Sequence, residues 1–230
     1  MNETQQAFLL HSRPFKEHQL IIDLLTQYDG KVSAVISSGH SLKANKKGIL
    51  QPFSLFSLQL SGKHSLKKAS QLESCHQPIM LAGNSLYSGL YLNELLVKLL
   101  PENIPCDGLF FSYKQVINQL NEAVQIEPIL RYFEMQLIEE LGVSFDFSVL
   151  ENNKVELFQL NMEQGFVEAS SENKSPIFEK QHLLAIAQEN INDPNVLNTH
   201  KRLMRQMLNH LLGYKPLKSR ELFIAREKKT

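Results

Sequence analysis

Hydrophobic and polar residues alternate along much of the first eighty residues, as they do in strands that bury one face. Asp29-Gly30 separates two of these runs, and this dipeptide accepts the positive φ of a tight hairpin turn. The pattern predicts five short strands, near residues 5–12, 18–27, 30–37, 52–61 and 65–73. We expect them to form a small closed barrel, because closure removes strand edges that so small a sheet could not protect. A long lysine-bearing loop, 37–51, interrupts it.

After about residue 80 the hydrophobic period changes to 3.6, which is typical of helices with one buried face. Apolar stripes predict helices over 92–99 and over 130–141, the latter followed by Gly142 as the glycine after the helix end. Another helix is expected to begin at Asp193-Pro194, an N-cap acid followed by proline. Between 142 and 177 the pattern weakens and predicts only a hairpin, 155–160 with 165–169, in otherwise irregular sequence.

These patterns predict an α+β protein with more than one domain. A five-stranded closed barrel is expected over residues 1–80, and a mainly helical domain over residues 81–230 with a small insertion near 142–177. The 230 residues are 43% apolar, which is enough for real cores. No run approaches the roughly eighteen apolar residues of a membrane span, and residues 1–5 lack a basic signal region, so we expect a cytoplasmic protein without membrane contact.

Charge changes this picture, because it is segregated along a chain whose net charge is zero. The three segments 1–80, 81–200 and 201–230 carry net charges of +4, −11 and +7. Between Gly30 and Leu72 there are seven lysines and no acidic residue. A basic region of this length is the usual footprint of a protein that binds a polyanion. The alternative is a solvated strand surface, which is the commoner meaning of a charge run.

Catalytic chemistry finds no support in the sequence. Gly83-Asn84-Ser85-Leu86-Tyr87 lacks the last glycine of a nucleophile elbow, and we expect Ser85 to cap a helix instead. Residues 39–48 do not have the order of a phosphate-binding loop, and no H-E-x-x-H occurs. Cys75 and Cys106, the only cysteines, are expected to be buried free thiols. We therefore expect no enzyme activity, no metal and no cofactor.

Five stretches, in order along the chain, resemble the RecO family of bacterial recombination mediators. They span nearly the whole sequence and are Ala7–Pro14, Gly48–Phe53, Leu86–Leu95, Leu130–Glu134 and Leu212–Leu222. The resemblance implies an N-terminal OB-fold and a C-terminal helical domain. It also implies a cytoplasmic protein that associates with the nucleoid during repair. Some members carry a four-cysteine zinc module in the helical domain. No cysteine follows Leu141 here, so this chain cannot supply those ligands.

The resemblance also implies a function. RecO proteins bind single- and double-stranded DNA, anneal complementary strands and recognise the acidic tail of single-strand-binding protein. They act with RecR, and sometimes RecF, to load RecA. An alternative is that this chain is chiefly an adaptor that bridges RecR and single-strand-binding protein and contacts DNA weakly. Its modest basicity leaves that alternative open.

The predicted DNA contacts are basic residues that would neutralise phosphates and release counterions. They are Arg13, Lys31, Lys43, Lys46, Lys47, Lys63, Lys67 and Lys68 in the barrel, and Lys215, Lys218 and Arg220 near the C-terminus. The second group could equally be an ordered turn that Ser219 caps or pins. Aromatic stacking on bases is a further possibility in OB-folds. Four residues lie in that region, Phe53, Phe56, His40 and His64, although the two phenylalanines are better placed in a core.

The predicted site for the tail of single-strand-binding protein lies on the helix over 130–141. An acidic tail that ends in phenylalanine needs an apolar pocket with a cation at its mouth. Arg131 is the position that matches, with Leu130, Phe133 and Leu137 as the apolar lining. The structural alternative is that Arg131 pairs with Glu127 or Glu134 at helical spacing.

Overall fold

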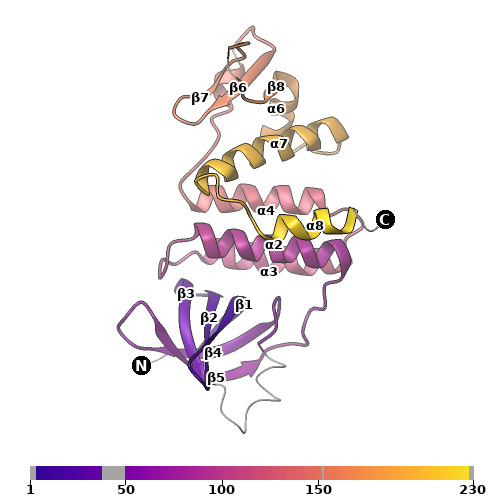
Figure 1. Ribbon diagram of the computed structural model, residues 1–230. Coiled ribbons are helices and arrows are strands. Elements are labelled where there is room, and N and C mark those ends of the chain that lie inside the picture. Colours follow the sequence, from indigo (N-terminus) through magenta and orange to yellow (C-terminus); the bar gives the residue numbers. More distant parts are fainter. Residues whose placement is uncertain (1–3, 38–49, 152, 173, 228–230) are drawn as a thin grey trace. The chain divides into compact units, whose positions relative to one another are not determined.

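The computed structural model describes residues 4–37, 50–151, 153–172 and 174–227 (Figure 1). Contacts between Cα atoms divide the chain into two compact units. The barrel unit contains residues 1–126 together with 217–230, and the second unit contains residues 127–216. The final helix, α8 (Ser219–Glu227), therefore belongs with the barrel.

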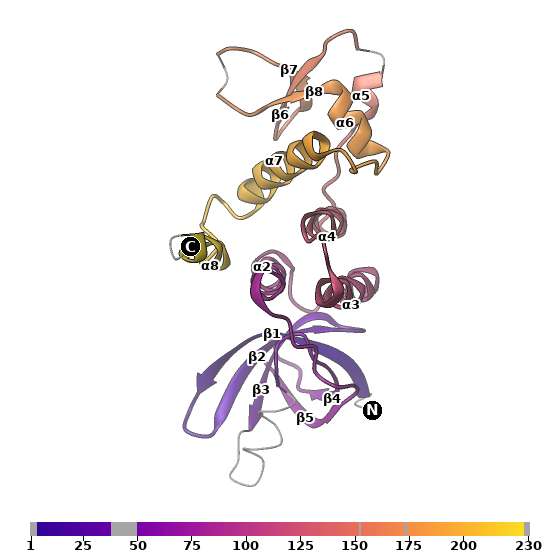
Figure 2. The same ribbon diagram turned by 90° about the vertical axis from the view of Figure 1, so that its right-hand side faces the viewer.

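Five strands form a closed barrel in the order β1-β2-β3-β5-β4 (Figure 2). They are β1 (Thr4–Phe15), β2 (Gln19–Thr26), β3 (Gly30–Ser37), β4 (Leu55–Ser61) and β5 (Lys67–Ser74). All neighbours are antiparallel except β3 and β5, which pair in parallel. The prediction of a small five-stranded barrel from the alternating pattern is confirmed.

The inward positions of these strands form the barrel core. Along β3 the burial alternates residue by residue, so that Val32, Ala34 and Ile36 are enclosed and their neighbours are not. Phe53 and Phe56 are also buried, as their apolar character predicted. The hairpin at Asp29-Gly30 is confirmed, with Gly30 at a φ of 66°. A side chain at Gly30 would collide with the carbonyl oxygen of Ile104.

Two further helices belong to the barrel unit, α2 (Gly83–Leu99) and α3 (Asp107–Glu122). Helix α2 begins at Gly83 after Ala82, without a side-chain cap, so the prediction that Ser85 caps it is wrong. Gly89 allows close packing, because a Cβ there would lie 2.7 Å from the ring of Phe53. Two stretches that carry the family resemblance thus meet at this contact.

The second unit combines helices with a small sheet of strand order β7-β6-β8. Its elements are α4 (Glu127–Glu140), α5 (Ser148–Glu151), β6 (Leu157–Asn161), β7 (Gly165–Glu168), β8 (Ile177–Glu179), α6 (Lys180–Ala187) and α7 (Pro194–Leu211). The predicted hairpin is confirmed as β6 and β7, and β8 adds a strand that was not predicted. The cap of α7 is confirmed, since the Asp193 carboxylate accepts a hydrogen bond from the Asn195 N–H at 2.7 Å.

Candidate nucleic-acid interface

An open groove of about 590 Å³ lies on the barrel where β3 pairs with β5. Strands β2, β3, β4 and β5 all contribute to its wall. The described lining residues are Gln19, Val35, Ser37, Ser61, Gly62, Leu66, Lys67, Lys68, Ala69, Ser70 and Gln71. None of these residues is acidic and none is aromatic. The groove therefore offers cations, hydroxyls and amides to a ligand.

Backbone geometry explains why the groove forms here. The parallel pairing that closes the barrel is brief, since only Ala34 with Lys67 and Val35 with Lys68 are in register. Gly62, at a φ of 109°, turns the chain out of β4. The Lys67 ammonium donates a hydrogen bond to the Gly62 carbonyl at 3.1 Å, which holds this turn against the start of β5.

Three of the predicted DNA contacts, Lys63, Lys67 and Lys68, come together at this groove or on the connection beside it. Lys63 and Lys68 are exposed and Lys67 is half-buried. None of the three forms an ion pair with a residue that the structure describes. The Lys63 and Lys68 ammonium groups are consequently available to a ligand, whereas Lys67 would have to exchange its bond to the Gly62 carbonyl for one to the ligand. Lys43, Lys46, Lys47 and His40 lie outside the described residues.

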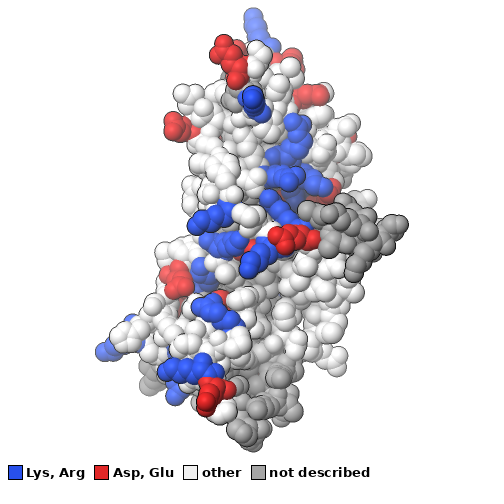
Figure 3. Space-filling view, in the orientation of Figure 1, with Lys and Arg blue, Asp and Glu red and all other residues white. Residues whose placement is uncertain are grey.

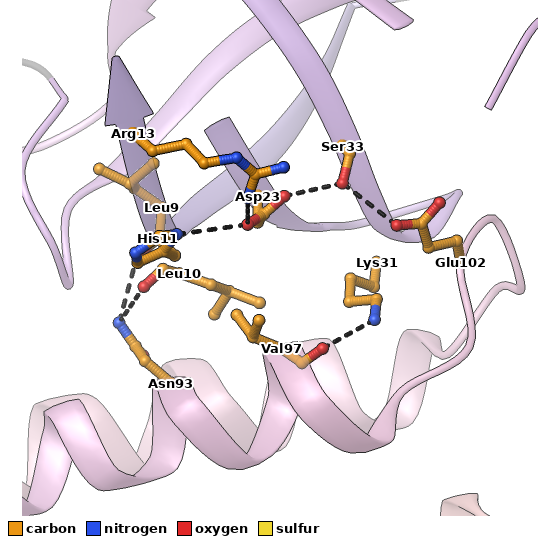
Figure 4. A network of polar contacts seen from close by, with 10 residues as sticks. All are labelled: Leu9, Leu10, His11, Arg13, Asp23, Lys31, Ser33, Asn93, Val97 and Glu102. Carbon is orange, nitrogen blue, oxygen red and sulfur yellow. Dashed lines mark hydrogen bonds and ion pairs between the residues drawn. The ribbon is translucent and has the colours of Figure 1, made fainter. Parts of the chain in front are cut away.

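Arg13 and Lys31 do not line the groove and lie instead in or beside a polar network around Asp23 (Figure 4). The Arg13 guanidinium lies 3.4 Å from the buried Asp23 carboxylate, which also accepts a hydrogen bond from the Ser33 hydroxyl at 2.7 Å. The Lys31 ammonium donates to the Val97 carbonyl at the end of α2, at 2.9 Å. Burial lowers the pKa of Lys31, against the opposing effect of Glu102 and Asp23. A phosphate contact by Lys31 would have to break the bond to Val97.

Asn93 completes the attachment of α2 to the barrel (Figure 4). Its side-chain amide donates to the Leu10 carbonyl at 3.1 Å, at a point where the β1–β2 register shifts. Its carbonyl oxygen accepts from the buried Tyr113 hydroxyl at 2.6 Å. Burial raises the pKa of Tyr113, so this hydroxyl stays protonated and can donate. Asn93 therefore joins the barrel, α2 and α3. It lies in Leu86–Leu95, one of the five stretches quoted for the resemblance, and its contacts there are structural.

The predicted C-terminal patch is divided between the two units. Lys215 is exposed in the second unit, whereas Lys218 and Arg220 belong to the barrel unit. Glu94 of α2 accepts hydrogen bonds at the start of α8 from the backbone N–H groups of Lys218 and Ser219 and from the Ser219 hydroxyl, at 2.7–3.0 Å. Although burial opposes ionisation, these bonds and one from Lys98 hold the pKa of Glu94 down to about 2. The alternative that Ser219 pins this segment is thus realised.

The four residues predicted to bind the protein tail all lie on α4. Leu130, Phe133 and Leu137 are buried core residues, at 8%, 0% and 0% exposure. Arg131 is also buried, and its guanidinium lies 2.8 Å from Glu134, which is wholly enclosed. Pairing with Glu134 is the structural alternative that the spacing allowed. A tail could reach the Arg131 guanidinium only if this pair opened.

His200 of α7 is buried in the same unit and electrostatically coupled to Arg131. Burial, with a further contribution from the Arg131 charge, lowers the pKa of His200 to about 4. The imidazole is therefore neutral at physiological pH. This keeps a second positive charge away from the Arg131–Glu134 pair.

A basic stripe formed by Lys201, Arg202 and Arg205 lies on the exposed side of α7, and Figure 3 shows Lys and Arg atoms gathered over this helix. Two members already have partners. Lys201 pairs with Glu127, and Arg202 donates to the Ile177 carbonyl while its guanidinium lies over the Phe178 ring. Only part of this charge is available to a ligand.

Within the described ranges, no three or more His, Cys, Asp or Glu residues are grouped to hold a metal ion. No helix in this part of the chain is long and apolar enough to cross a membrane. Cys106 is buried as expected, but Cys75 is only half-buried, so the expectation was wrong for that thiol.

Comparison with known proteins decides the family. The model of the "Recombination protein O N terminal" domain matches residues 1–78, and that of the "Recombination protein O C terminal" domain matches residues 80–221. The chain belongs to the RecO family. A DNA repair protein RecO from Psychromonas ingrahamii is 39% identical over 97% of this chain and 99% of its own. One from Hahella chejuensis is 41% identical over 95% and 93%. The match confirms the resemblance and the N-terminal OB-fold, and it makes the chain a RecO-family DNA repair protein.

Sequence reasoning missed most of the polar groove lining. Gln19, Ser37, Ser61, Ser70 and Gln71 were not predicted as contacts, because serine and glutamine at alternating positions look like any solvated strand surface. Only an indirect signal in the sequence could have indicated these residues. The strand order of an OB-fold would have placed the ends of β3 and β4 beside the start of β5.

Proposed function

We propose that this chain binds DNA in the barrel groove and acts as a recombination mediator. The observation that carries the proposal is a groove with Lys67 and Lys68 in its lining, and no acidic residue, on the OB-fold of a RecO-family protein. Lysines at such a site neutralise phosphates and release condensed counterions, which gives sequence-independent, salt-sensitive affinity. Single- and double-stranded DNA share those phosphates, so both are proposed ligands.

Annealing follows from the same chemistry. Two complementary strands repel each other through their phosphates, and a protein that neutralises part of this charge lowers the barrier to pairing. Lys218, just before α8, and Arg220 are proposed as a second contact in the barrel unit, and Lys215 is proposed as a separate contact in the second unit. Together with RecR, the chain would then promote RecA loading on DNA coated by single-strand-binding protein.

Recruitment to coated DNA is proposed to use Arg131. The carboxylate of an acidic tail would replace Glu134 as the partner of the guanidinium, because one cation cannot hold both carboxylates at full strength. This makes Glu134 a competitor of the tail. Glu134→Gln should therefore raise affinity for a tail peptide, whereas Arg131→Ala should abolish binding. Glu134→Gln could instead destabilise the second unit without changing the affinity of the folded molecules for the tail peptide. That result would mean that Arg131 has only a structural role.

The test of the proposed function is annealing of complementary oligonucleotides coated with the cognate single-strand-binding protein, without ATP and with chelator present. We expect faster annealing, and we expect the acceleration to disappear when the acidic tail of the coat protein is deleted. Lys67→Ala combined with Lys68→Ala should slow the reaction, with Lys174→Ala as a control at an exposed lysine of the second unit. No acceleration with tail binding intact would refute the mediator proposal.

The adaptor is the second candidate function. It is favoured by Arg13 and Lys31, two predicted DNA contacts that lie in the Asp23 network. An adaptor would bind RecR and the tail peptide with little affinity for DNA. The salt dependence of binding to single-stranded DNA separates the two functions, because several phosphate contacts make affinity fall steeply as salt rises.

A further inference from the structure

We infer that the barrel groove holds a strand by its phosphates and leaves the bases unstacked and free to pair. This inference rests on the proposed DNA binding and specifies its mode. OB-folds commonly bind single strands by combining a basic groove with aromatic rings on which successive bases stack. The groove of this chain has the first component, and its described lining lacks the second.

The polar groups of the lining match a sugar–phosphate backbone. Lys67 and Lys68 supply cations and Gln71 supplies an amide. The hydroxyls of Ser61 and Ser70 donate to the Lys68 and Gln59 carbonyls in long bonds of 3.4 and 3.5 Å, and would turn to a phosphate on binding. Such groups make most protein contacts to phosphate and sugar, and these contacts carry no sequence information. The apolar part of the lining, Val35, Leu66 and Ala69, offers no flat π-face to a base.

Four aromatic rings of the barrel unit are either buried or distant from the groove. Phe8, Phe53 and Phe56 are buried, at 2%, 3% and 0% exposure. Tyr28 is 51% exposed but lies at the β2–β3 turn, whereas Ser37 of the groove lies at the far end of β3, about 25 Å along an eight-residue strand.

Two rings of the described chain, Phe15 and His64, adjoin residues of the groove lining. Phe15 ends β1 opposite Gln19, is half-buried, and has the Lys16 ammonium 5.4 Å from its ring centroid. His64 is exposed on the connection between β4 and β5. Neither ring lines the groove, and each provides a single-residue test of the inference.

Unstacked bases have a direct consequence for annealing. A strand whose bases stack on protein must give up those contacts before it pairs, so tight stacking slows duplex formation. A strand held only through phosphates can pair while bound, since its Watson–Crick edges face away from the protein. Affinity then depends on the number of phosphates and not on the bases they carry.

The test compares oligothymidylate with an abasic phosphodiester oligomer of equal length and charge, by fluorescence anisotropy over a range of salt concentrations. We expect dissociation constants within about threefold and equal salt slopes, because each stacked base would be worth roughly 5- to 150-fold in affinity. Lys67→Ala with Lys68→Ala should weaken both oligomers equally.

Weaker binding of the abasic oligomer by more than about tenfold, at an unchanged salt slope, would overturn the inference, since even one or two stacked bases would have this effect. Loss of that difference in Phe15→Leu or His64→Ala would then identify the stacking ring. Absence of binding by both oligomers would refute the proposed function itself, and the inference with it.

Discussion

Two regions of the barrel carry lysines from the same acid-free stretch of sequence, yet these lysines have different surroundings. On the side that faces α2, the Lys31 ammonium ends on the Val97 carbonyl with Glu102 and Asp23 nearby. At the groove, Lys68 is exposed and has no acidic partner in the described chain. The charge of a sequence segment is therefore not enough to identify which of its lysines contact a ligand. The element that packs across the strand decides whether a lysine holds the fold or remains available.

The largest expected effect concerns the groove. Replacing Lys67 and Lys68 by glutamate should weaken binding to single-stranded DNA by roughly 100-fold or more at 0.1 M salt, since each lost phosphate contact costs about tenfold there. The salt slope should also fall by about 2. Anisotropy titrations measure both quantities. The control is Lys174→Glu, and equal losses in the two variants would mean that the groove has no special role.

The next effect concerns the attachment of α2 to the barrel, where Asn93→Ala should lower the free energy of unfolding by about 1–3 kcal/mol, because the buried Leu10 carbonyl loses its donor. Urea denaturation measures this change, with Asn118→Ala as the control at an exposed asparagine of α3. DNA affinity of the folded variant should stay unchanged. A loss of DNA affinity without a loss of stability would show that the α2 attachment takes part in DNA binding, contrary to the structural role proposed for it.

A smaller effect is expected from Lys31→Met, which keeps the aliphatic stem and removes the ammonium. The lost bond to Val97 should cost about 1 kcal/mol of stability and leave DNA affinity unaltered. Lys68→Met is the matched variant, and it should show the reverse pattern, with reduced affinity and normal stability. If both variants lost affinity, Lys31 would belong to the interface after all.

The smallest effect is a pH dependence of the α2–α8 contact. The folded-state pKa of Glu94, about 2, lies below its ordinary value of 4.5, so the unfolded state binds the proton more readily. The stabilisation is complete above pH 4.5 and disappears as pH falls toward 2. The protection factors of the α8 amides, which correct for the intrinsic exchange rate at each pH, should fall as the pH is lowered over that range, and Glu94→Gln should remove the dependence. An unchanged pH profile in Glu94→Gln would show that another group is responsible.

The fold could be predicted where one hydrophobic period, of strand or of helix, extends over many residues. Alternation along β3 marks its buried side because Val32, Ala34 and Ile36 face one core. Helix α4, predicted over 130–141, also carries its apolar residues at helical spacing, with Leu130, Phe133 and Leu137 all buried, whereas helix α3 was not predicted. Strand β8 was not predictable, because three residues are too few to show a period.

The site was less readable, because its meaning depends on contacts between distant residues. The partner of Lys31 lies 66 positions away along the chain, so its structural role left no local signal. Arg131 and Glu134 are three positions apart, so their pairing was visible as an alternative, whereas their burial was not. Gly62 and the brief pairing of Ala34 with Lys67 create the groove, and neither feature stands out in the sequence.

We propose that the groove lysines contact DNA while Lys31 holds the barrel to α2. Acetylation rates of individual lysines, measured by mass spectrometry with and without a bound single strand, test it without any substitution. We predict that Lys67 and Lys68 react in the free protein and are protected by DNA, whereas Lys31 reacts slowly in both states and Lys174 reacts equally in both. Protection of Lys31 by DNA, with Lys67 and Lys68 still reactive, would contradict the account.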